Sequence, residues 1–421
     1  SVSTAIGDNF NYTDLDQVWA NRGYFGRVNY AYKGKILLEG NVRYDGTSRF
    51  PDQYKWGFFP SASVGYIISK ENFFQPLASV IDLFKLRASY GRLGNMNVRN
   101  VYYQATMNRN TNNWLDLSGT PYSYMSAPGL GNAALTWEKP TTLNLGGDIN
   151  LFQNKLQTSF DWFKRVTKDM VGPPIELPQT LGTTIPKANN TELTSTGWEF
   201  TITHKNGVRD FKYNVGLGLS ASKVVVTKYP SERGLLPDVW SPFSGNQEYR
   251  EGMVLGEVWG YKTVGFIQDE ETLEKINNGE HDQSEIFSGK WVLGDIMYAD
   301  LNGDGAVNEG ERTLDDHGDL SIIGNETPDF LFNINVSASW KNFDVKTFWT
   351  GTGPAEWFPR KLPEQERWFN GFMRFQFWGS ARNTIRPAFQ MHKDHWTPEN
   401  RDAYFPTPHL EHGLGDQNAR S

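Results

Sequence analysis

The sequence contains no cysteine, which excludes disulfide bonds and thiolate metal sites. No apolar run reaches the roughly 18 residues that a membrane-spanning helix needs, so any crossing of a bilayer must use strands. Lysine and arginine show no clustered surplus and the formal net charge is -7, which argues against nucleic acid as a partner. Ser1 to Phe10 show no basic and apolar leader, so we expect a removed signal or an internal piece of a longer chain.

Aromatic residues make up 14 % of the 421 residues, and apolar and polar side chains alternate over long stretches. The alternation is clearest from Arg22 to Phe50, where bulky apolar residues share one parity on each side of Lys33-Gly34 and most charged residues take the other. This pattern predicts a two-residue turn between strands of about ten residues, the length that a tilted strand needs to cross a bilayer. Taken alone, such a hairpin is more typical of a soluble β-sandwich.

The alternation recurs along the chain, and the connections between strands are sorted by length. Tight turns are predicted at Lys33, Gln153, Asn206 and Lys341, and they alternate with long loops such as Met170 to Ser195. All tight turns then lie at one end of the strands and all long loops at the other, which is typical of transmembrane barrels. We therefore predict an all-β fold, an antiparallel transmembrane β-barrel with long extracellular loops, to which this chain supplies roughly ten strands.

The two faces of these strands have different expected surroundings. Lipid would contact one set of side chains near the tight turns, namely Tyr30, Tyr32, Ile36 and Leu38. The lumen would be lined by polar side chains of the opposite parity, such as Asn41, Arg43, Asn144 and Asp148. We expect all 421 residues to belong to one barrel domain, with residues 229–329 as a long extracellular excursion.

Short motifs that combine glycine, aromatic and charged residues punctuate the chain. In order they are Asp45 to Phe50, Trp56 to Ser61, Leu86 to Gly91 with Gly94-Asn95, Leu135 to Lys139, Thr196 to Glu199, Gly294-Asp295, Asp300 to Gly305 and Asn342 to Asp344. Each is weak alone, but together they cover most of the chain in one order. In this order the chain resembles the SusC/RagA family of TonB-dependent outer-membrane transporters of Bacteroidetes.

The resemblance implies a barrel of about 22 strands filled by an N-terminal plug. It implies import of oligosaccharides or peptides across the bacterial outer membrane, driven by TonB, and a SusD-like lipoprotein over the outer mouth. A dimer of transporter and lipoprotein pairs is a further assembly of this kind. Neither a plug with its TonB-contacting segment nor the family's last strands can be recognised between Ser1 and Ser421, so we expect the chain to be a barrel section of a longer protein.

The segment from Asp300 to Glu311 has the spacing of a calcium-binding loop, with a glycine at the sharp turn. Its oxygen donors would be Asp300, Asn302, Asp304, the carbonyl of Ala306, Asn308 directly or through water, and Glu311. A structural Ca²⁺ is the cofactor that this spacing favours, and a metal-free turn rich in aspartate, asparagine and glycine is the alternative. The resemblance implies the same stretch, so the motif is partly a mark of the family.

No catalytic motif is recognisable, and we predict that the chain is not an enzyme. Aromatic side chains among polar neighbours in the long loops could contact sugar rings or peptide side chains. These candidates are Trp114, Tyr122, Tyr124, Trp240, Trp357 and Trp368. Two alternative functions remain open: a passive porin, and a secreted, calcium-stabilised β protein that binds or hydrolyses glycans.

Overall fold

A computed structural model describes residues 19–97, 107, 109–115, 119, 121–125, 129–174, 185–230, 236, 249–286, 289–356 and 390–408. The chain divides into two compact units. The first, the sheet unit, comprises Ser1–Pro230 and Phe330–Thr352, and the other, the second unit, comprises Ser231–Asp329 and Gly353–Ser421. Nearly all of the predicted excursion thus belongs to the second unit, and its extracellular position stays a prediction.

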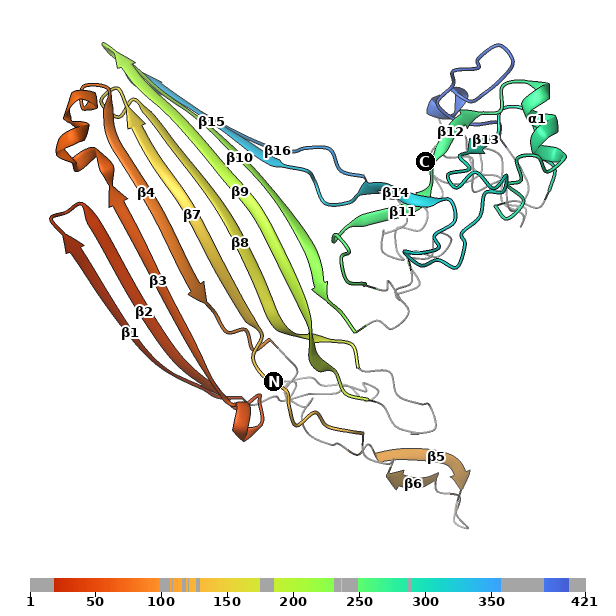
Figure 1. The fold of residues 1–421 in the computed structure, drawn as a ribbon, viewed down its shortest axis with the longest axis horizontal. Coiled ribbons are helices and arrows are strands. Elements are labelled where there is room, and N and C mark those ends of the chain that lie inside the picture. The colour runs from red at the N-terminus through yellow and green to blue at the C-terminus, as the bar shows by residue number, and fades with distance from the viewer. Residues whose placement is uncertain are drawn as a thin grey trace. The chain divides into compact units, whose positions relative to one another are not determined.

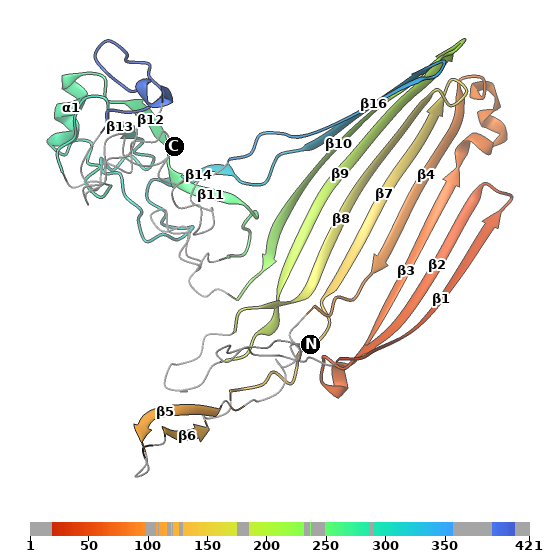
Figure 2. The same ribbon diagram turned by 180° about the vertical axis from the view of Figure 1, so that it is seen from behind.

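The sheet unit is built on one ten-stranded antiparallel sheet, whose strands lie side by side in Figures 1 and 2. In spatial order they are β1 (Asn21–Tyr32), β2 (Ile36–Thr47), β3 (Trp56–Ile67), β4 (Ile81–Arg92), β7 (Lys139–Leu151), β8 (Leu156–Gly172), β9 (Ala188–Val208), β10 (Phe211–Lys228), β15 (Leu331–Trp340) and β16 (Phe343–Thr352). Each strand of this sheet pairs with the sheet strand that precedes it along the chain. Longer segments intervene between β4 and β7 and between β10 and β15, and the second of these belongs to the second unit. The predicted all-β, antiparallel architecture is confirmed.

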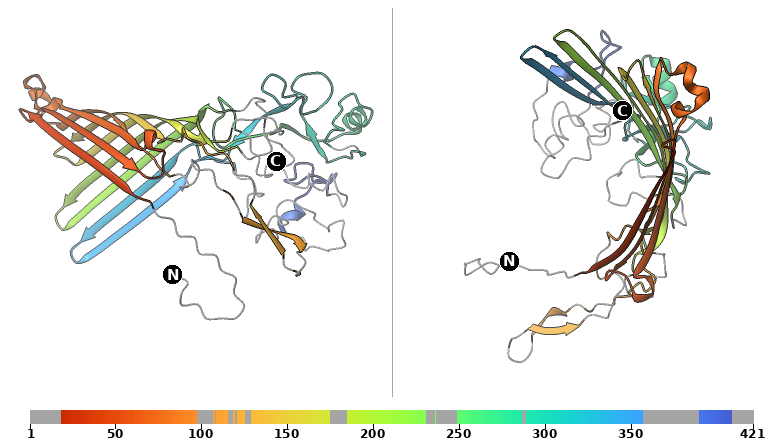
Figure 3. Two further views of the ribbon diagram at one scale, coloured as in Figure 1. Left: turned by 90° about the horizontal axis from the view of Figure 1, so that it is seen from below. Right: turned by 90° about the vertical axis from the view of Figure 1, so that its left-hand side faces the viewer.

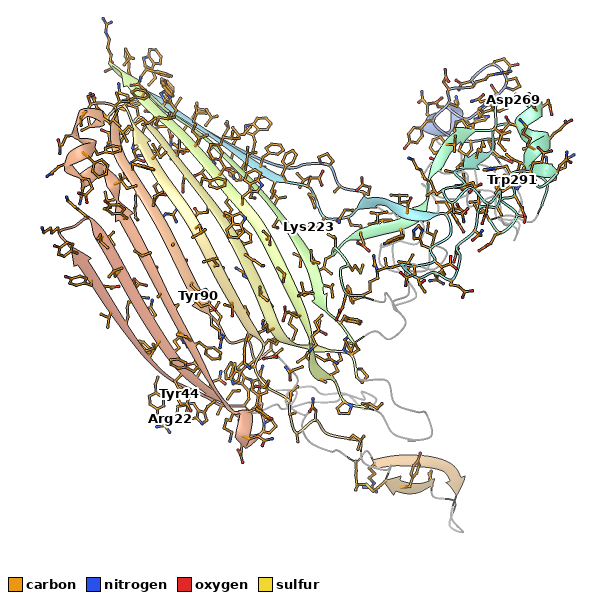
Figure 4. All side chains as sticks on the ribbon, viewed as in Figure 1. Arg22, Tyr44, Tyr90, Lys223, Asp269 and Trp291 are labelled. Atoms are coloured by element: carbon orange, nitrogen blue, oxygen red, sulfur yellow. The ribbon has the colours of Figure 1, made fainter. Side chains whose placement is uncertain are left out.

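The pairing register gathers side chains of like character on each face of the sheet. One row on the apolar face runs through Tyr30, Leu38, Val64, Ala88 and Leu145. Leu38 is 44 % exposed and Leu145 is 46 % exposed, so the described residues leave this row largely uncovered. Because side chains alternate along a strand, the polar residues of these strands meet on the opposite face. Tyr44 and Tyr90, which Figure 4 labels, belong to the apolar face.

Tight turns join the strands at one end of the sheet. The turns at Lys33-Gly34 and at Lys341 lie where the alternation predicts them, and the turn after β7 includes Gln153. The turn predicted at Asn206 is wrong, because Asn206 pairs with Tyr213 inside the sheet and the chain reverses at Arg209 instead. Asn-Gly favours a hairpin turn, but pairing beyond it adds further ladder hydrogen bonds and extends both strands.

The connections at the other end are longer and more irregular. The loop predicted from Met170 to Ser195 is shorter than expected, because β8 continues to Gly172 and β9 already begins at Ala188. Between β4 and β7, a separate hairpin forms from β5 (Arg109–Leu115) and β6 (Pro121–Met125). A short 3-10 helix, η2 (Asp52–Tyr54), precedes β3 at this end. At the tight-turn end, β3 and β4 are joined by a longer connector that holds two 3-10 helices, η3 (Ile68–Lys70) and η4 (Asn72–Leu77).

The second unit has small sheets, one described α-helix and an ordinary apolar core. β11 (Glu257–Tyr261) pairs with β14 (Leu320–Asn325), and β12 (Thr263–Phe266) pairs with β13 (Ile296–Tyr298). Helix α1 (Glu270–Asn277) begins after Asp269, whose side chain accepts a hydrogen bond from the Thr272 amide, and η8 (Gln390–Lys393) is a short 3-10 helix. Trp291, labelled with Asp269 in Figure 4, is buried in the core. None of the helices that the structure describes has the length and apolarity to span a membrane.

Candidate functional site

The polar face of the sheet is hollowed where five neighbouring strands, β1 to β4 and β7, meet. Its polar lining side chains are Asn29, Glu39, Ser63, Lys85, Arg87, Ser89 and Asn144. The alternation of each strand sends these residues to one face, and antiparallel pairing brings the faces of neighbours into register. The predicted lumen residue Asn144 lines this hollow directly.

An arginine-centred cluster lies beside the hollow on the same face. The Arg87 Nε donates to Asp148 Oδ2 at 2.9 Å, and its Nη2 donates to Asp148 Oδ1 at 3.0 Å and to Asp161 Oδ2 at 2.8 Å. Ser159 Oγ accepts from Arg87 Nη2 at 3.1 Å and donates to Asp148 Oδ1 at 3.0 Å. One guanidinium thus ties together β4, β7 and β8 in a half-buried network, which fixes both carboxylates in place.

The ion pairs of this arginine-centred cluster pass over Gly146 of β7, which has no side chain. A Cβ on Gly146 would lie 2.3 Å from Asp161 Oδ1 and 3.1 Å from Arg87 Cζ, so a side chain there would collide with the ion pair. Asp148 was among the predicted lumen residues, whereas Arg87, Ser159 and Asp161 were not singled out as members of the site. Their shared parity with the polar residues of each strand is the signal that could have found them.

Polar contacts also cover the same face of β1 and β2. The Arg27 Nε donates to Asn41 Oδ1 at 2.6 Å, and Asn41 in turn donates to Glu39 at 2.7 Å. Arg43 forms an ion pair with Asp45 at 3.1 Å. The structure therefore places the predicted residues Asn41, Arg43, Asn144 and Asp148 on one face, divided among three local groups.

At the loop end of the sheet, three of the sequence motifs meet in a small apolar core, called here the rim core. Its buried members are Phe50, Phe59, Leu135 and Trp137. The Trp137 ring lies 5.3 Å from both phenylalanine rings, and its Nε1 donates to the Lys55 carbonyl at 3.2 Å. A Cβ on Gly57 or Gly94 would lie 2.3 or 2.1 Å from the Phe59 ring, so both motif glycines make room for it. The packing of these motif residues therefore holds the loops against the end of the sheet.

The predicted calcium loop is stabilised by its own backbone. The Asp300 carboxylate accepts from the amides of Gly303 at 2.6 Å and Gly305 at 2.8 Å. Desolvation raises the pKa of this carboxyl, but the hydrogen bonds from Gly305 and Gly303 outweigh it and hold the pKa below its ordinary value. Asn302 accepts from the Asp304 amide at 2.9 Å and donates to the Asp304 carboxylate at 3.0 Å, so the first three predicted ligands lie in one turn.

The later positions of the calcium pattern are arranged differently. Asn308 donates to the Ala306 carbonyl at 3.2 Å, whereas Glu311 is exposed and no described hydrogen bond or ion pair joins it to the loop. The buried Asp319 carboxylate accepts from the amides of Leu301 at 2.6 Å and Asn308 at 2.9 Å. Sequence spacing missed Asp319, which lies beyond the motif. Among the described residues, no three histidine or acidic side chains converge as a metal site requires.

The six aromatic candidates for substrate contact are only partly described. Tyr124 lies on β6 with half of its side chain exposed, and Trp114 and Tyr122 belong to β5 and β6, where only their backbone is described. The remaining three, Trp240, Trp357 and Trp368, lie outside the described residues. The β5–β6 hairpin therefore brings three candidates into one element.

An exposed apolar face, a hollowed polar face and tight turns at one end define the wall of a membrane β-barrel. Comparison with known proteins identifies the family: residues 2–360 match the family described as TonB dependent receptor-like, beta-barrel. The chain belongs to this family, as the SusC/RagA resemblance predicts. Its members are outer-membrane β-barrel receptors and transporters and not enzymes, and the chain accordingly belongs to the outer membrane.

Relatives and solved structures agree with this assignment. TonB-dependent receptor P3 of Formosa agariphila is 31 % identical over 336 residues, which are 79 % of this chain and 32 % of the relative. TonB-dependent receptor SusC of Bacteroides thetaiotaomicron is 26 % identical over 326 residues, 76 % of this chain and 30 % of SusC. A structure of the RagAB peptide transporter has the same fold, with a TM-score of 0.67 at 19 % identity over 95 % of this chain and 38 % of that chain. The chain thus spans about a third of the length of these relatives.

Proposed function

We propose that this chain forms part of the wall of a TonB-energised transporter that imports oligosaccharides or peptides through the outer membrane. The observation that carries the proposal is the continuous polar face opposite a continuous apolar face in a chain of the TonB-dependent receptor family. The shared fold with the RagAB peptide transporter supports the import of nutrients. Both substrate classes stay within the proposal.

In this proposal the chain breaks no bond and serves as a fixed, polar passage wall. The Arg87 cluster keeps two carboxylates and a guanidinium in set positions, so the wall offers charged groups without long mobile side chains. The moving part would be an N-terminal plug on which TonB pulls. The loop-end aromatics, with Tyr124 described as half exposed, would hold the substrate at the mouth.

Energy dependence distinguishes this proposal from a passive porin. Cells that express the full-length protein are given labelled maltodextrins or short peptides, and uptake is measured before and after deletion of TonB or collapse of the proton gradient. We expect uptake above the receptor-free background to disappear in both treatments. Uptake that persists in both would favour the porin and overturn active transport.

The role of the polar face is tested with a matched pair of neighbouring residues. Asn144→Trp introduces a bulky side chain into the hollow, whereas Leu145→Trp places the same side chain on the apolar face. We expect slower uptake for the first variant and unchanged uptake for the second at equal amounts of assembled protein. Equal uptake by both would show that this hollow is not part of the path.

We also propose that a SusD-like lipoprotein covers the outer mouth and that transporter and lipoprotein pairs form dimers. The family resemblance supports this assembly. Affinity purification of the full-length protein from outer membranes, followed by mass spectrometry and mass photometry, should recover a lipoprotein in equal amount and a particle of two pairs. Recovery of the transporter alone, in mild detergent, would contradict the partnership. A water-soluble product would instead favour the secreted glycan-binding alternative.

We further propose that the loop from Asp300 binds Ca²⁺ as a structural ion. The support is that Asp300, Asn302 and Asp304 lie in one turn of the loop. Glu311, the twelfth residue of the pattern, is exposed to solvent. Amide exchange of residues 300–311 is measured with Ca²⁺ and with a chelator, for the natural protein, Asp300→Asn and the exposed control Asp315→Asn. We expect Ca²⁺ to slow exchange in the natural protein and in Asp315→Asn but not in Asp300→Asn. Identical exchange of the natural protein in both solutions would overturn calcium binding.

A further inference from the structure

The connector between β3 and β4 carries an apolar surface that the described residues leave uncovered. Phe73 is 71 % exposed, Leu77 51 % and Val80 42 %. Phe152, from the turn after β7, is 52 % exposed, and its amide donates to the Val80 carbonyl at 2.8 Å, so the two connections lie together. These four residues are called the interface patch. Contiguous exposed apolar side chains of this kind mark a surface that contacts a partner or a membrane.

The connector lies against the apolar face of the sheet. Phe74, in η4, is buried, and its ring centroid lies 6.1 Å from that of Phe84 on β4. Phe84 pairs with Ile149 in the row that continues the apolar face. Figure 3 shows the helical segment, coloured orange, on the outer side of the curved sheet. The interface patch is therefore continuous with the face that the membrane covers in this family.

Positive charge accompanies the interface patch. Lys70 Nζ donates to the Gly34 carbonyl at 2.9 Å, and Lys33 lies 5.3 Å from the Tyr32 ring with its side chain exposed. Lys35 forms an ion pair with Glu71 at 2.9 Å, whereas no ion pair within the described part of the chain involves Lys33 or Lys70, so these three lysines exceed the one nearby carboxylate by two charges. On the other side of the connector, Asp82 accepts a hydrogen bond from the Asn154 amide at 2.8 Å, and Lys155, the next residue of that turn, carries the opposite charge. A net positive edge beside an apolar patch complements an anionic headgroup above acyl chains.

We propose that residues 68–80 form a membrane-interface anchor that binds a phospholipid in the leaflet at the tight-turn end. The glycerol and upper acyl region would pack on the interface patch, while Lys33 and Lys70 reach the headgroup phosphate. A tight turn would suffice to join β3 and β4, as it does for the other neighbouring hairpins, and the longer connector adds this contact. The inference rests on the membrane location of the family and is independent of the proposed transport.

The first experiment measures whether the interface patch lies in lipid. Because the chain has no cysteine, Phe73→Cys and Gln153→Cys each introduce a single labelling site into this chain. Any other cysteine of the full-length protein is replaced by serine. Each is labelled with a polarity-sensitive dye in nanodiscs whose phospholipids carry bromine on the upper acyl chain. We expect the dye at 73 to emit at shorter wavelength and to be quenched at least about two-fold more than the dye at 153. Equal quenching at the two positions would overturn the proposal.

The second experiment tests the headgroup contact. Native mass spectrometry counts phosphatidylglycerol retained by the full-length protein, by the double variant Lys33→Gln with Lys70→Gln, and by Lys223→Gln. Lys223 lies in the half of β10 that is farther from the tight turns (Figure 4). We expect the double variant to retain about one lipid fewer and Lys223→Gln to match the natural protein. Equal retention by all three proteins would remove the lysines from the site. Uptake should be normal in all variants that assemble.

Discussion

The sheet and the second unit distribute apolar and charged side chains in opposite ways. On the sheet, large apolar residues such as Val42 and Trp349 are 47 % and 64 % exposed, while charged groups gather on the hollowed face. In the second unit, Ile267 and Leu320 are fully buried and form an ordinary core. The sheet is therefore suited to lipid on one face, and the second unit is suited to water on its surface.

The two regions also neutralise charge differently. Arg87 on the sheet is about a third exposed and shares its charge between two carboxylates. In the second unit, the Arg250–Glu257 ion pair is almost fully buried, and Glu257 also accepts from Trp259 Nε1 at 2.8 Å. Removing one partner of a buried ion pair leaves the other charge without compensation, whereas a charge on a solvent-accessible face can be hydrated. The comparison thus predicts where a single substitution is most damaging.

The largest expected effect is at the buried ion pair. Glu257→Ala leaves the Arg250 guanidinium buried without its carboxylate, and we expect about 3–5 kcal/mol lower stability of the second unit. Amide exchange across β11 measures this loss in the full-length protein. The control is Lys275→Ala, which removes an exposed pair with Glu271. Similar exchange in both variants would show that the buried pair is not the stronger constraint.

A smaller effect is expected when charge is added to the lipid-facing side of the sheet. Val42→Arg places a charge on the apolar face in the middle of β2, and we expect a cost of about 2–4 kcal/mol. Asn41→Arg puts the same side chain on the polar face one residue earlier. Heat-modifiable mobility in gel electrophoresis measures the assembled fraction. Poor assembly of the first variant and near-normal assembly of the second are expected, and equal assembly would contradict the assigned faces.

Sequence alternation was sufficient to predict the faces, because a period of two residues is a local property. It was insufficient at Asn206, where a favourable turn sequence is overridden by pairing of Gly207 with Lys212 in the extended hairpin. The motifs from Asp45 to Phe50 and around Trp137 indicated the family, but the sequence alone did not show what these residues do physically. Only the packing of the rim core shows why glycine and aromatic residues are needed together there.

The candidate site could be predicted only in part, because its contacts join distant strands. Arg87 meets Asp148 and Asp161 at sequence separations of 61 and 74 residues, and the register that brings them together depends on every intervening turn. For the same reason the spacing of the calcium pattern indicated Glu311, whereas Asp319, which lies beyond the pattern, joins Asp300 in accepting hydrogen bonds from the loop's backbone. Local motifs identify residue types, and pairing decides which of them meet.

The smallest effect is expected at the exposed start of α1 in the second unit. Hydrogen bonds from Thr272 hold the pKa of Asp269 below its ordinary value, so the ionised form is favoured in the folded state. The stabilisation is therefore present above the ordinary pKa and is lost as pH falls through the lowered pKa. We expect Asp269→Ala to speed amide exchange of residues 270–277 a few-fold at pH 7 and to leave β2 unaffected. The difference between variant and natural protein should vanish in acid, and a difference that persists there would show that capping by the ionised carboxylate is not its cause.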